Sequence, residues 1–351
     1  MPLACLAVLA SASPSPASKW AAHAPPAVFS GADTVQAWCA NQPRPQFAAL
    51  TRVPAPSGWF QVYSVDSGVY AIAESHQWEE VISYLIVGTD RALLFDTGMG
   101  IEDIRVVVRA LTDRPVAVFN SHTHPDHIGN NWAFDRIYAL NTAYTRANSH
   151  GWPHGAVAAE VTPDHFCGPA PTGFDTAGYY TRPFRITDTV GNGSIIDLGG
   201  RRVQVLHIPG HAPDAAALWD EAHGLLFTGD TFYEGPIYVF APGADADAFA
   251  QSAGRLAALA PRARKVLAAH NVPVSDPKLL LRLRDAVAEV ARAETAGPRG
   301  DFWTQLHVIG AYTMSQVPSP TIDSGTTERS VLVTYDFGAF SLVYRHRVDG
   351  Q

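Results

Sequence analysis

The sequence predicts an α+β protein of four layers, in which two packed sheets carry helices on their outer faces. From Trp59 a series of apolar and alternating segments is typical of strands, and a helix and a buried strand follow them. The same order of strands and then helices recurs from Ser194 onward. Two such halves bury both of their sheets most simply by packing sheet against sheet, with the helices outside.

Length and composition indicate a globular protein. The chain has 351 residues, 47% of them hydrophobic, which is ample for a core. Its 33 acidic and 25 basic residues are intermixed and give a net charge of −8, so we expect no nucleic-acid partner. No apolar run reaches the roughly 20 residues of a spanning helix, so no membrane role is expected. The expected partner is a small-molecule substrate, and the oligomeric state stays open.

The N-terminal region divides into two segments. Residues 1–18 contain an apolar run and an Ala-Ser-Ala triplet like a cleavage site, but no basic residue precedes Lys19. This segment is either an export signal, which implies a bacterial-type periplasmic or secreted protein, or a disordered tail of a cytoplasmic one. Residues 19–57 lack periodicity and are expected to form an arm on the main domain, residues 58–351.

Cysteine usage is compatible with either location. Cys5 lies in the first segment and would leave with a signal peptide. Cys39 and Cys167 either form a disulfide or stay as free buried thiols, and their spacing does not decide between the two.

The first half of the main domain begins as a meander of antiparallel strands, with a turn at residues 88–91. Apolar positions at helical spacing then predict a helix over residues 101–111. Residues 116–119 form the continuous apolar run that a central strand needs. The strands expected in the meander are residues 60–65, 68–73, 82–87 and 92–96.

A long connection, about residues 145–192, separates the halves and is crowded with Gly, Pro and aromatic residues. It is too long for an ordinary loop, so we expect an insertion that caps the functional site. Its aromatic residues Tyr179, Tyr180 and Phe184 either line the site or anchor the insertion itself.

The second half repeats short strands and then helices. Helices are expected at residues 246–259 and 276–293, with a strand at 265–269 between them. A terminal hairpin is expected around the Asp-Phe-Gly at residues 336–338. The earlier strands of this half are expected at residues 194–198, 202–206, 215–219 and 225–228.

Four metal-capable side chains follow the strand at residues 116–119: His122, His124, Asp126 and His127. Imidazole and carboxylate are preferred ligands of zinc and its neighbours. Residues two apart in an extended chain point the same way, so His122 and His124 can share one ion while Asp126 and His127 reach a second. A polar surface loop would not need this spacing, and the loop therefore predicts half of a two-metal site.

Three more ligand-type residues, His211, Asp230 and His270, each stand where an apolar run ends. The carboxyl ends of strands are where open sheets place their sites. Each residue alone is a weak signal, but together with the loop they provide seven ligands, which suits two ions.

These motifs resemble the metallo-β-lactamase superfamily of hydrolases. The resemblance rests on His-x-His-x-Asp-His at 122–127, Pro-Gly-His at 209–211, Thr-Gly-Asp at 228–230, His270 and a strand-end Asp-Thr-Gly at 96–98. It covers about residues 59–295 and is specific for the superfamily but not for the substrate. It implies the αβ/βα metallo-β-lactamase sandwich, with the site at one edge. By this resemblance His122, His124 and His211 would hold one ion, Asp126, His127 and His270 the other, and Asp230 would bridge them.

The activity implied by the resemblance is hydrolysis by two Zn²⁺ ions, or by other divalent transition metals. A hydroxide bridging two cations about 3.5–4 Å apart would attack an ester-type bond. Asp126 would orient that hydroxide or pass its proton to the leaving group. Asp96 would accept an N–H from a ligand histidine.

Features of individual branches favour a lactone or a similar small carbonyl ester as substrate. Asp230 argues against β-lactam hydrolysis, because β-lactamases generally lack a bridging Asp. Tyr233 reproduces the spacing of quorum-quenching lactonases, in which a phenol contacts the attacked carbonyl oxygen. The alternative for Tyr233 is packing on its own loop. Trp78 either covers the substrate or packs on the surface.

Other activities stay open. A glyoxalase II-like thioesterase would use a basic cluster, which Lys278, Arg282 and Arg284 reproduce only in part. Organophosphate and β-lactam hydrolysis are further alternatives within the superfamily. An iron-dependent oxidoreductase and a non-catalytic metal-binding protein are alternatives of other classes.

Overall fold

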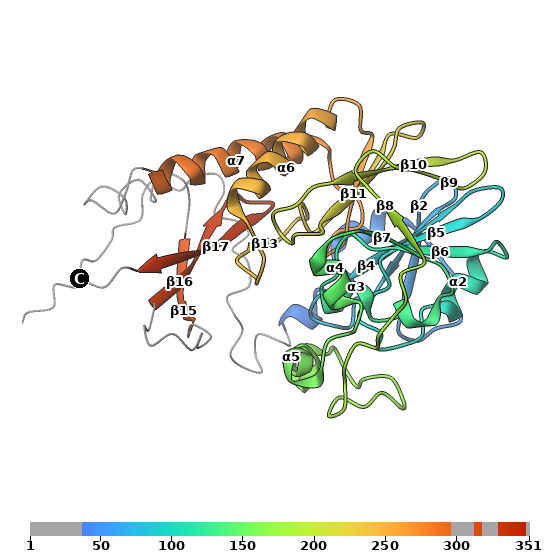
Figure 1. Ribbon diagram of the computed structural model, residues 1–351. Coiled ribbons are helices and arrows are strands. Elements are labelled where there is room, and N and C mark those ends of the chain that lie inside the picture. Colours follow the sequence, from blue (N-terminus) through green and yellow to red (C-terminus); the bar gives the residue numbers. More distant parts are fainter. Residues whose placement is uncertain (1–36, 296–311, 318–328, 349–351) are drawn as a thin grey trace, which may run out of the picture.

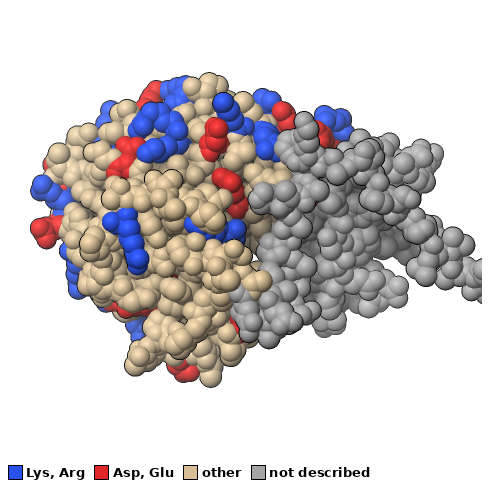
Figure 2. Space-filling model, turned by 180° about the vertical axis from the view of Figure 1, so that it is seen from behind, with Lys and Arg blue, Asp and Glu red and all other residues tan. Residues whose placement is uncertain are grey.

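The computed structural model describes residues 37–295, 312–317 and 329–348 (Figure 1). The predicted signal or tail at residues 1–18, with Cys5, and the first part of the arm lie outside the described residues. Among the residues that are described, no helix combines the length and apolar character needed to cross a membrane. On the face in Figure 2, Lys and Arg side chains alternate with Asp and Glu, as the mixed charges of the sequence indicate.

The first sheet contains the predicted meander. Its strands β2 (Gln61–Asp66), β3 (Val69–Ala73), β4 (Ile82–Val87) and β5 (Ala92–Phe95) pair antiparallel in chain order. The chain then passes through helix α2 (Arg105–Leu111), shorter than predicted, and returns as β6 (Val116–Phe119), parallel to β5. The predicted meander and central strand are therefore confirmed.

Three short strands of this sheet lie where the sequence predicts none. β1 (Thr51–Val53) belongs to the expected arm and pairs antiparallel with β2. β7 (Ile137–Leu140) and β8 (Asp188–Val190) extend the other edge in parallel, although β8 belongs to the expected insertion. Segments of three or four residues carry little periodicity, so hydrogen bonds to a neighbouring strand decide their structure.

The second sheet has five strands in the order β14-β12-β11-β10-β9. The pairing is antiparallel from β9 to β12, and β14 is parallel to β12. Helix α6 (Ala246–Leu259) has the predicted bounds, and α7 (Lys278–Thr295) starts two residues later than predicted. The strands are β9 (Ile195–Asp197), β10 (Arg202–His207), β11 (Ala216–Asp220), β12 (Leu225–Gly229) and β14 (Lys265–Ala268).

The two sheets pack face to face, and alternation along each strand assigns the side chains to separate cores. Tyr84 of β4 lies in the core between the sheets with Phe227 of β12, their rings 5.4 Å apart. The next residue, Leu85, points to the opposite face, where α2 packs. Leu226 of β12 faces the core under α6 and α7. This arrangement is the predicted four-layer sandwich.

A third, four-stranded sheet was not predicted. The expected terminal hairpin is present as β16 (Arg329–Asp336) and β17 (Ser341–Val348). β15 (Tyr312–Val317) joins one side of it, and β13 (Pro236–Val239), from the middle of the chain, pairs parallel with β17 on the other. Buried residues of this sheet share the core of α6 and α7, beside which it lies in Figure 1.

The connection between the halves is built from short helices: α4 (Ala143–Asn148), α5 (His154–Val157) and the 3-10 turns η3 (Ala158–Val161) and η4 (Pro163–His165). Tyr179 is buried and donates a hydrogen bond to Met99 O at 2.7 Å, so it anchors the connection. Phe184 packs partly buried on the same core, whereas Tyr180 is exposed. Two further 3-10 turns are η1 (Pro45–Ala49) and η2 (Asn131–Ala133).

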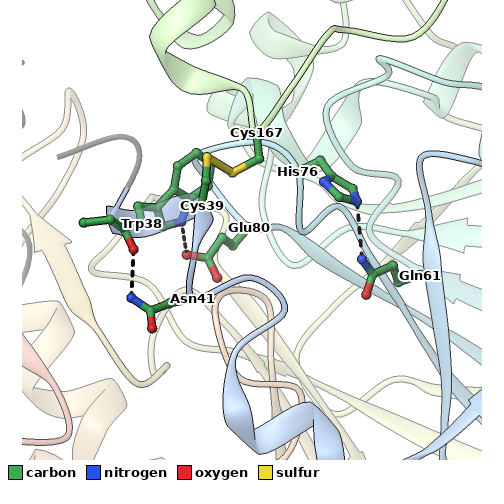
Figure 3. Close-up of a disulfide and its surroundings, with 8 residues drawn as sticks. Trp38, Cys39, Asn41, Gln61, His76, Glu80 and Cys167 are labelled. Atoms are coloured by element: carbon green, nitrogen blue, oxygen red, sulfur yellow. Dashed lines mark hydrogen bonds between the residues drawn. A yellow bond between two sulfur atoms is a disulfide. The ribbon is translucent and has the colours of Figure 1, made fainter. Parts of the chain in front are cut away.

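A disulfide between Cys39 and Cys167 resolves the alternative that spacing left open (Figure 3). It ties the arm before β1 to the end of the short-helix region. Nearby, Trp38 Nε1 donates to Glu80 Oε1 at 2.8 Å, and Arg44 forms an ion pair with the same carboxylate at 2.6 Å. Trp78 packs between arm and connection, with its ring 5.0 Å from Trp38 and 6.0 Å from His165. The described part of the arm, from residue 37 onward, therefore packs on the body of the protein.

Candidate metal centre

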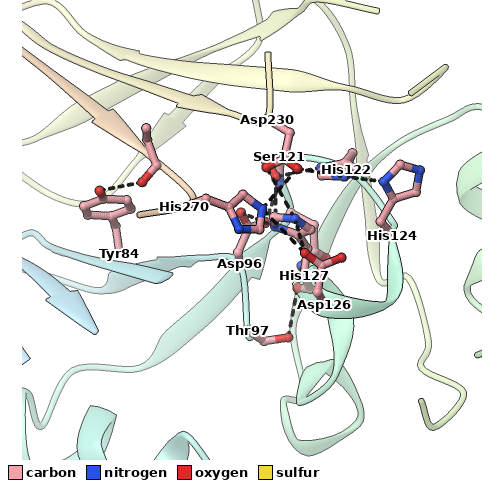
Figure 4. Close-up of polar contacts among 12 residues, drawn as sticks. Tyr84, Asp96, Thr97, Ser121, His122, His124, Asp126, His127, Asp230 and His270 are labelled. Atoms are coloured by element: carbon pink, nitrogen blue, oxygen red, sulfur yellow. Dashed lines mark hydrogen bonds and ion pairs between the residues drawn. The ribbon is translucent and has the colours of Figure 1, made fainter. Parts of the chain in front are cut away.

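The seven predicted ligands meet at the edge where strands of both sheets end. Figure 4 labels six of them, all except His211. His122 and His124 follow β6, and Asp126 and His127 lie on the one-turn helix α3 (Pro125–Ile128), which Pro125 starts at its first position. The other half of the site comes from the second sheet. His211 follows β10, Asp230 follows β12 and His270 follows β14.

The first group consists of three histidines, His122, His124 and His211. His122 Nε2 lies 2.9 Å from His124 Nδ1, and His211 Nε2 lies 3.2 and 3.1 Å from these two atoms. Three nitrogens bound to one tetrahedral zinc at about 2.0–2.1 Å would stand about 3.3 Å apart. The three imidazoles thus already have a spacing that suits a single ion.

The second group joins Asp126, His127 and His270 with Asp230. Asp126 Oδ2 lies 2.9 Å from His127 Nε2 and 3.5 Å from His270 Nε2. Asp230 Oδ2 lies 3.1 Å from His270 Nε2 and also 3.5 Å from His211 Nε2 in the first group. Asp230 therefore stands between the two groups, as a bridging ligand must.

Contacts on the other ring nitrogen orient His127, His211 and His270. His127 Nδ1 lies 3.0 Å from Asp96 Oδ2, so the contact predicted for Asp96 is present, and Ser121 N donates to the other carboxylate oxygen at 2.6 Å. His211 Nδ1 lies 2.7 Å from Tyr238 O, and His270 Nδ1 lies 2.6 Å from Glu79 O. Such contacts fix the tautomer that directs the remaining nitrogen at a metal.

Two buried atoms support the fit of a metal ion. His127 Nε2 and Asp230 Oδ1 lie 3.4 Å apart, and in the described part of the chain neither atom has a partner with hydrogen-bond geometry, although His127 Nε2 also lies 2.9 Å from Asp126 Oδ2. Buried polar atoms without partners are costly, and an ion between them would satisfy both. Nitrogen and oxygen donors in this combination suit zinc and its neighbours.

The pKa values of the histidines shift in different directions in the two groups. Burial and the neighbouring His211 lower the pKa of His124 to about 3, and burial likewise lowers the pKa of His122 and His211, so all three imidazoles are neutral near pH 7. For His127 burial acts in the same direction, but Asp126 and Asp230 outweigh it and raise its pKa well above the usual value. A metal at the second group would replace this proton.

The site opens on the side of His124 and Asp126, which are half-buried while His127 and Asp230 are buried. Tyr233 is buried with its ring 5.0 Å from the His270 ring, and its hydroxyl donates to Pro236 O. The structure thus places Tyr233 beside the second group but with its hydroxyl engaged by its own loop.

Several contacts that support the ligand histidines were not predicted from the sequence. Glu79 and Tyr238 act through backbone carbonyls, which every residue possesses. Ser121 was also missed, although its position between the strand and His122 could have suggested a role. Its Oγ lies 3.0 Å from His122 Nδ1.

Comparisons with known proteins agree with this geometry. A family model described as "Metallo-beta-lactamase superfamily" matches residues 77–270. The acyl-coenzyme A thioesterase MBLAC2 of Gallus gallus is 28% identical over 229 residues, which cover 60% of this chain and 80% of the thioesterase. A linear primary-alkylsulfatase from Pseudomonas sp. is 28% identical over 162 residues, covering 38% of this chain and 30% of that protein.

Solved structures share the fold. The sec-alkylsulfatase Pisa1 from Pseudomonas sp. superposes with a TM-score of 0.52 at 19% identity, covering 67% of this chain and 43% of the alkylsulfatase. This chain therefore corresponds to less than half of that enzyme, and the likeness concerns the fold alone.

Proposed function

Because this chain belongs to the metallo-beta-lactamase superfamily, we propose that it is a dinuclear zinc hydrolase acting on ester-type bonds of a small molecule. One observation carries the proposal. Seven side chains from two halves of the chain converge in two adjacent groups, and Asp230 lies between them. A structural metal site is closed, whereas this one opens on the side of His124 and Asp126, as a catalytic site requires.

The residues divide the work between them. His122, His124 and His211 would hold one ion, and Asp126, His127 and His270 the other, with Asp230 shared. Two bound cations would activate a water as nucleophile and neutralise the charge that develops on the attacked group. Asp126 lies on the open side and is the carboxylate placed to orient that water or to receive its proton.

The substrate class is a carbonyl ester or thioester. The thioesterase relative supports a thioester, since it matches this chain over most of its own length. A lactone is the second candidate and is favoured by Tyr233, three residues beyond Asp230 and next to the ring of His270. For Tyr233 to donate to a substrate oxygen, its hydroxyl must leave Pro236 O.

A substrate panel tests the proposal. The zinc-loaded protein would be assayed with acyl-CoA thioesters, acyl lactones, a chromogenic β-lactam, a phosphotriester and an alkyl sulfate. We expect turnover of a thioester or a lactone by the wild type. The variants Asp230→Ala and His211→Ala should lose both this turnover and bound metal. Unchanged metal content and turnover in both variants would overturn the proposal.

The metal and the Tyr233 role are tested separately. Elemental analysis of protein purified without added metal should find zinc, whereas iron would favour an oxidoreductase. Tyr233→Phe should lower lactone turnover at unchanged metal content, and unchanged turnover would remove its role as an oxyanion donor.

The disulfide is the basis for a proposal about the cellular location of the protein. Cys39–Cys167 favours the periplasmic or secreted alternative, because such bonds persist in oxidising compartments. Fractionation of cells that express the full chain tests this, and a protein found only in the cytoplasm would contradict it.

A further inference from the structure

A buried carboxylate outside both metal groups links the two loops of the first group. Asp214 is 3% exposed and lies three residues after His211. Its Oδ2 accepts a hydrogen bond from Thr123 Oγ1 at 2.6 Å, and Thr123 stands between His122 and His124. One carboxylate therefore connects the loops that carry all three histidines of the first group.

The same carboxylate also holds helix α4. Thr145 Oγ1, on α4, donates to Asp214 Oδ2 at 3.0 Å. From the last residue of that helix, Asn148 Nδ2 donates to Thr123 Oγ1 at 3.0 Å and to Thr123 O at 3.1 Å. Trp152 Nε1 donates to Thr123 O at 3.2 Å. The helix and the residues after it thus contact both Thr123 and Asp214.

The contacts of Asp214 concern only one metal position. Thr123 is flanked by the two histidines of the first group, whereas His127 and His270 are held by Asp96 and by Glu79 O. Asp214 Oδ1 is buried and, among the residues that the structure places, has no hydrogen-bond partner. The side-chain donors to this carboxylate are the two hydroxyls, and the backbone N–H groups of Thr123 and Asp214 also stabilise its charged form, so loss of one hydroxyl should loosen the carboxylate and the loops attached to it.

We propose that Asp214 is a positioning residue for the three-histidine metal position, and that it makes the affinity of this position depend on the docking of helix α4. The proposal rests on the proposed function, because it assumes that the three histidines bind a metal. Through Thr123, Asp214 fixes the backbone from which His122 and His124 project, and α4 completes this support from the connection between the halves.

Isosteric variants test the proposal with the full chain. Thr123→Val and Thr145→Val each remove one hydroxyl at nearly constant volume, and Asp214→Asn keeps the shape but removes the charge. Thr187→Val is the matched control, because Thr187 Oγ1 bonds Ile137 O and Asp188 at the far edge of the first sheet. Metal affinity at each position would be measured by chelator competition. The absorption spectrum of the cobalt-substituted protein would distinguish the three-histidine position, which shares only Asp230, from the second position, which also has Asp126.

The expected result is selective. Thr123→Val and Asp214→Asn should weaken the three-histidine position about tenfold, and Thr145→Val about threefold, while the second position changes less than about twofold. The cobalt spectrum should change only in the bands of the three-histidine position, and Thr187→Val should match the wild type. If Asp214→Asn does not fold, the two threonine variants decide.

Two results would overturn the inference: variants that bind both ions like the wild type, or equal weakening of both positions, which indicates a general structural role. A wild-type protein that binds two ions and hydrolyses esters, with unaffected variants, overturns this inference alone. A wild-type protein that binds no metal overturns the proposed function as well.

Discussion

In the candidate metal centre, single hydrogen-bond contacts on a ring nitrogen determine the orientation of a histidine. Asp96 combines two such contacts, since it faces His127 Nδ1 and also accepts from Ser121 N. It does so at a φ of 66°, a conformation that aspartate, like asparagine, adopts more readily than most residues. The residue is thus suited to its place by both chemistry and backbone.

Replacing Asp96 should therefore affect one metal position more than the other. Asp96→Asn keeps the backbone conformation but leaves one carbonyl oxygen for two donors, so we expect about 10–100-fold weaker binding at the second group. Metal titration with a chelator measures this. Asp113→Asn, on an exposed turn, is the control, and equal affinities in all three proteins would contradict the prediction.

A second residue-scale prediction concerns Glu74, which is 1% exposed. Burial raises its pKa to about 7, although Trp59 Nε1 and Met99 N each donate to it at 2.8 Å. The folded protein then binds a proton that the unfolded chain, with a pKa near 4.5, releases. Stability from this group is full below about pH 4.5 and is lost as the pH rises through about 7.

The measurement is the free energy of unfolding in urea between pH 5 and 7.5. The wild type should lose about 2 kcal/mol relative to Glu74→Gln across this range. Comparing the two proteins at each pH cancels the titration of the histidines. A difference that does not change with pH would contradict the assigned pKa.

At the scale of elements, α6 approaches the chain just before His211. A Cβ added at Gly210 would lie 2.3 Å from Phe249 Cα, and the φ of 141° at Gly210 also disfavours a side chain. The Asp245 N–H donates to Gly210 O at 2.8 Å, while the Asp245 side chain caps the helix. The start of α6 and the ligand loop are therefore fixed together.

Gly210→Ala should consequently destabilise the protein by about 3 kcal/mol, from overlap and backbone strain together. Gly254→Ala, within helix α6, is the matched control. Nothing lies within 4 Å of its added Cβ, so we expect a gain of up to about 1 kcal/mol. Urea unfolding of both variants measures the two effects, and similar values for the two would be the contrary result.

The disulfide acts between elements that lie far apart in the sequence. Cys39 and Cys167 are separated by 128 residues, so their bond restricts a long loop of the unfolded chain. We expect the double variant Cys39→Ser/Cys167→Ser to lose about 4 kcal/mol of stability. Reductant should lower the melting temperature of the wild type and leave that of the double variant unchanged. Equal responses of the two proteins to reductant would argue against this bond in solution.

For the whole molecule, the metal groups join the two sheets, since each sheet provides part of the ligand set. Ions that bind only the folded state stabilise it by mass action, by about 2.7 kcal/mol per ion at a hundredfold excess over Kd. A chelator should therefore lower the melting temperature of the wild type substantially. In Asp230→Ala the shift should be much smaller, and an equal shift in both proteins would show that Asp230 binds no metal.

The chemistry of the site and the order of the main strands are local properties, so they could be read from the chain. Alternation in β2–β5 and the apolar run of β6 define buried faces without reference to a partner. The ligand candidates were recognisable because four metal-capable side chains share one loop and three more stand at strand ends, although each alone is a weak signal. Spacing in the loop assigned His122 and His124 to one ion and Asp126 and His127 to another, whereas His211, Asp230 and His270 were assigned to the two groups only through resemblance to a family.

Other features depend on which distant segments meet, and no local pattern contains that information. The segments β1, β7 and β8 are strands because they pair with neighbouring strands, and β13, from the middle of the chain, pairs with the terminal hairpin. The same holds for the pairing of Cys39 with Cys167, the hydroxyl of Tyr233 on Pro236 O, and the place of Asp214 between Thr123 and Thr145. Residue chemistry and periodicity are local properties of the sequence, whereas hydrogen bonds between distant segments form only when the two halves pack together.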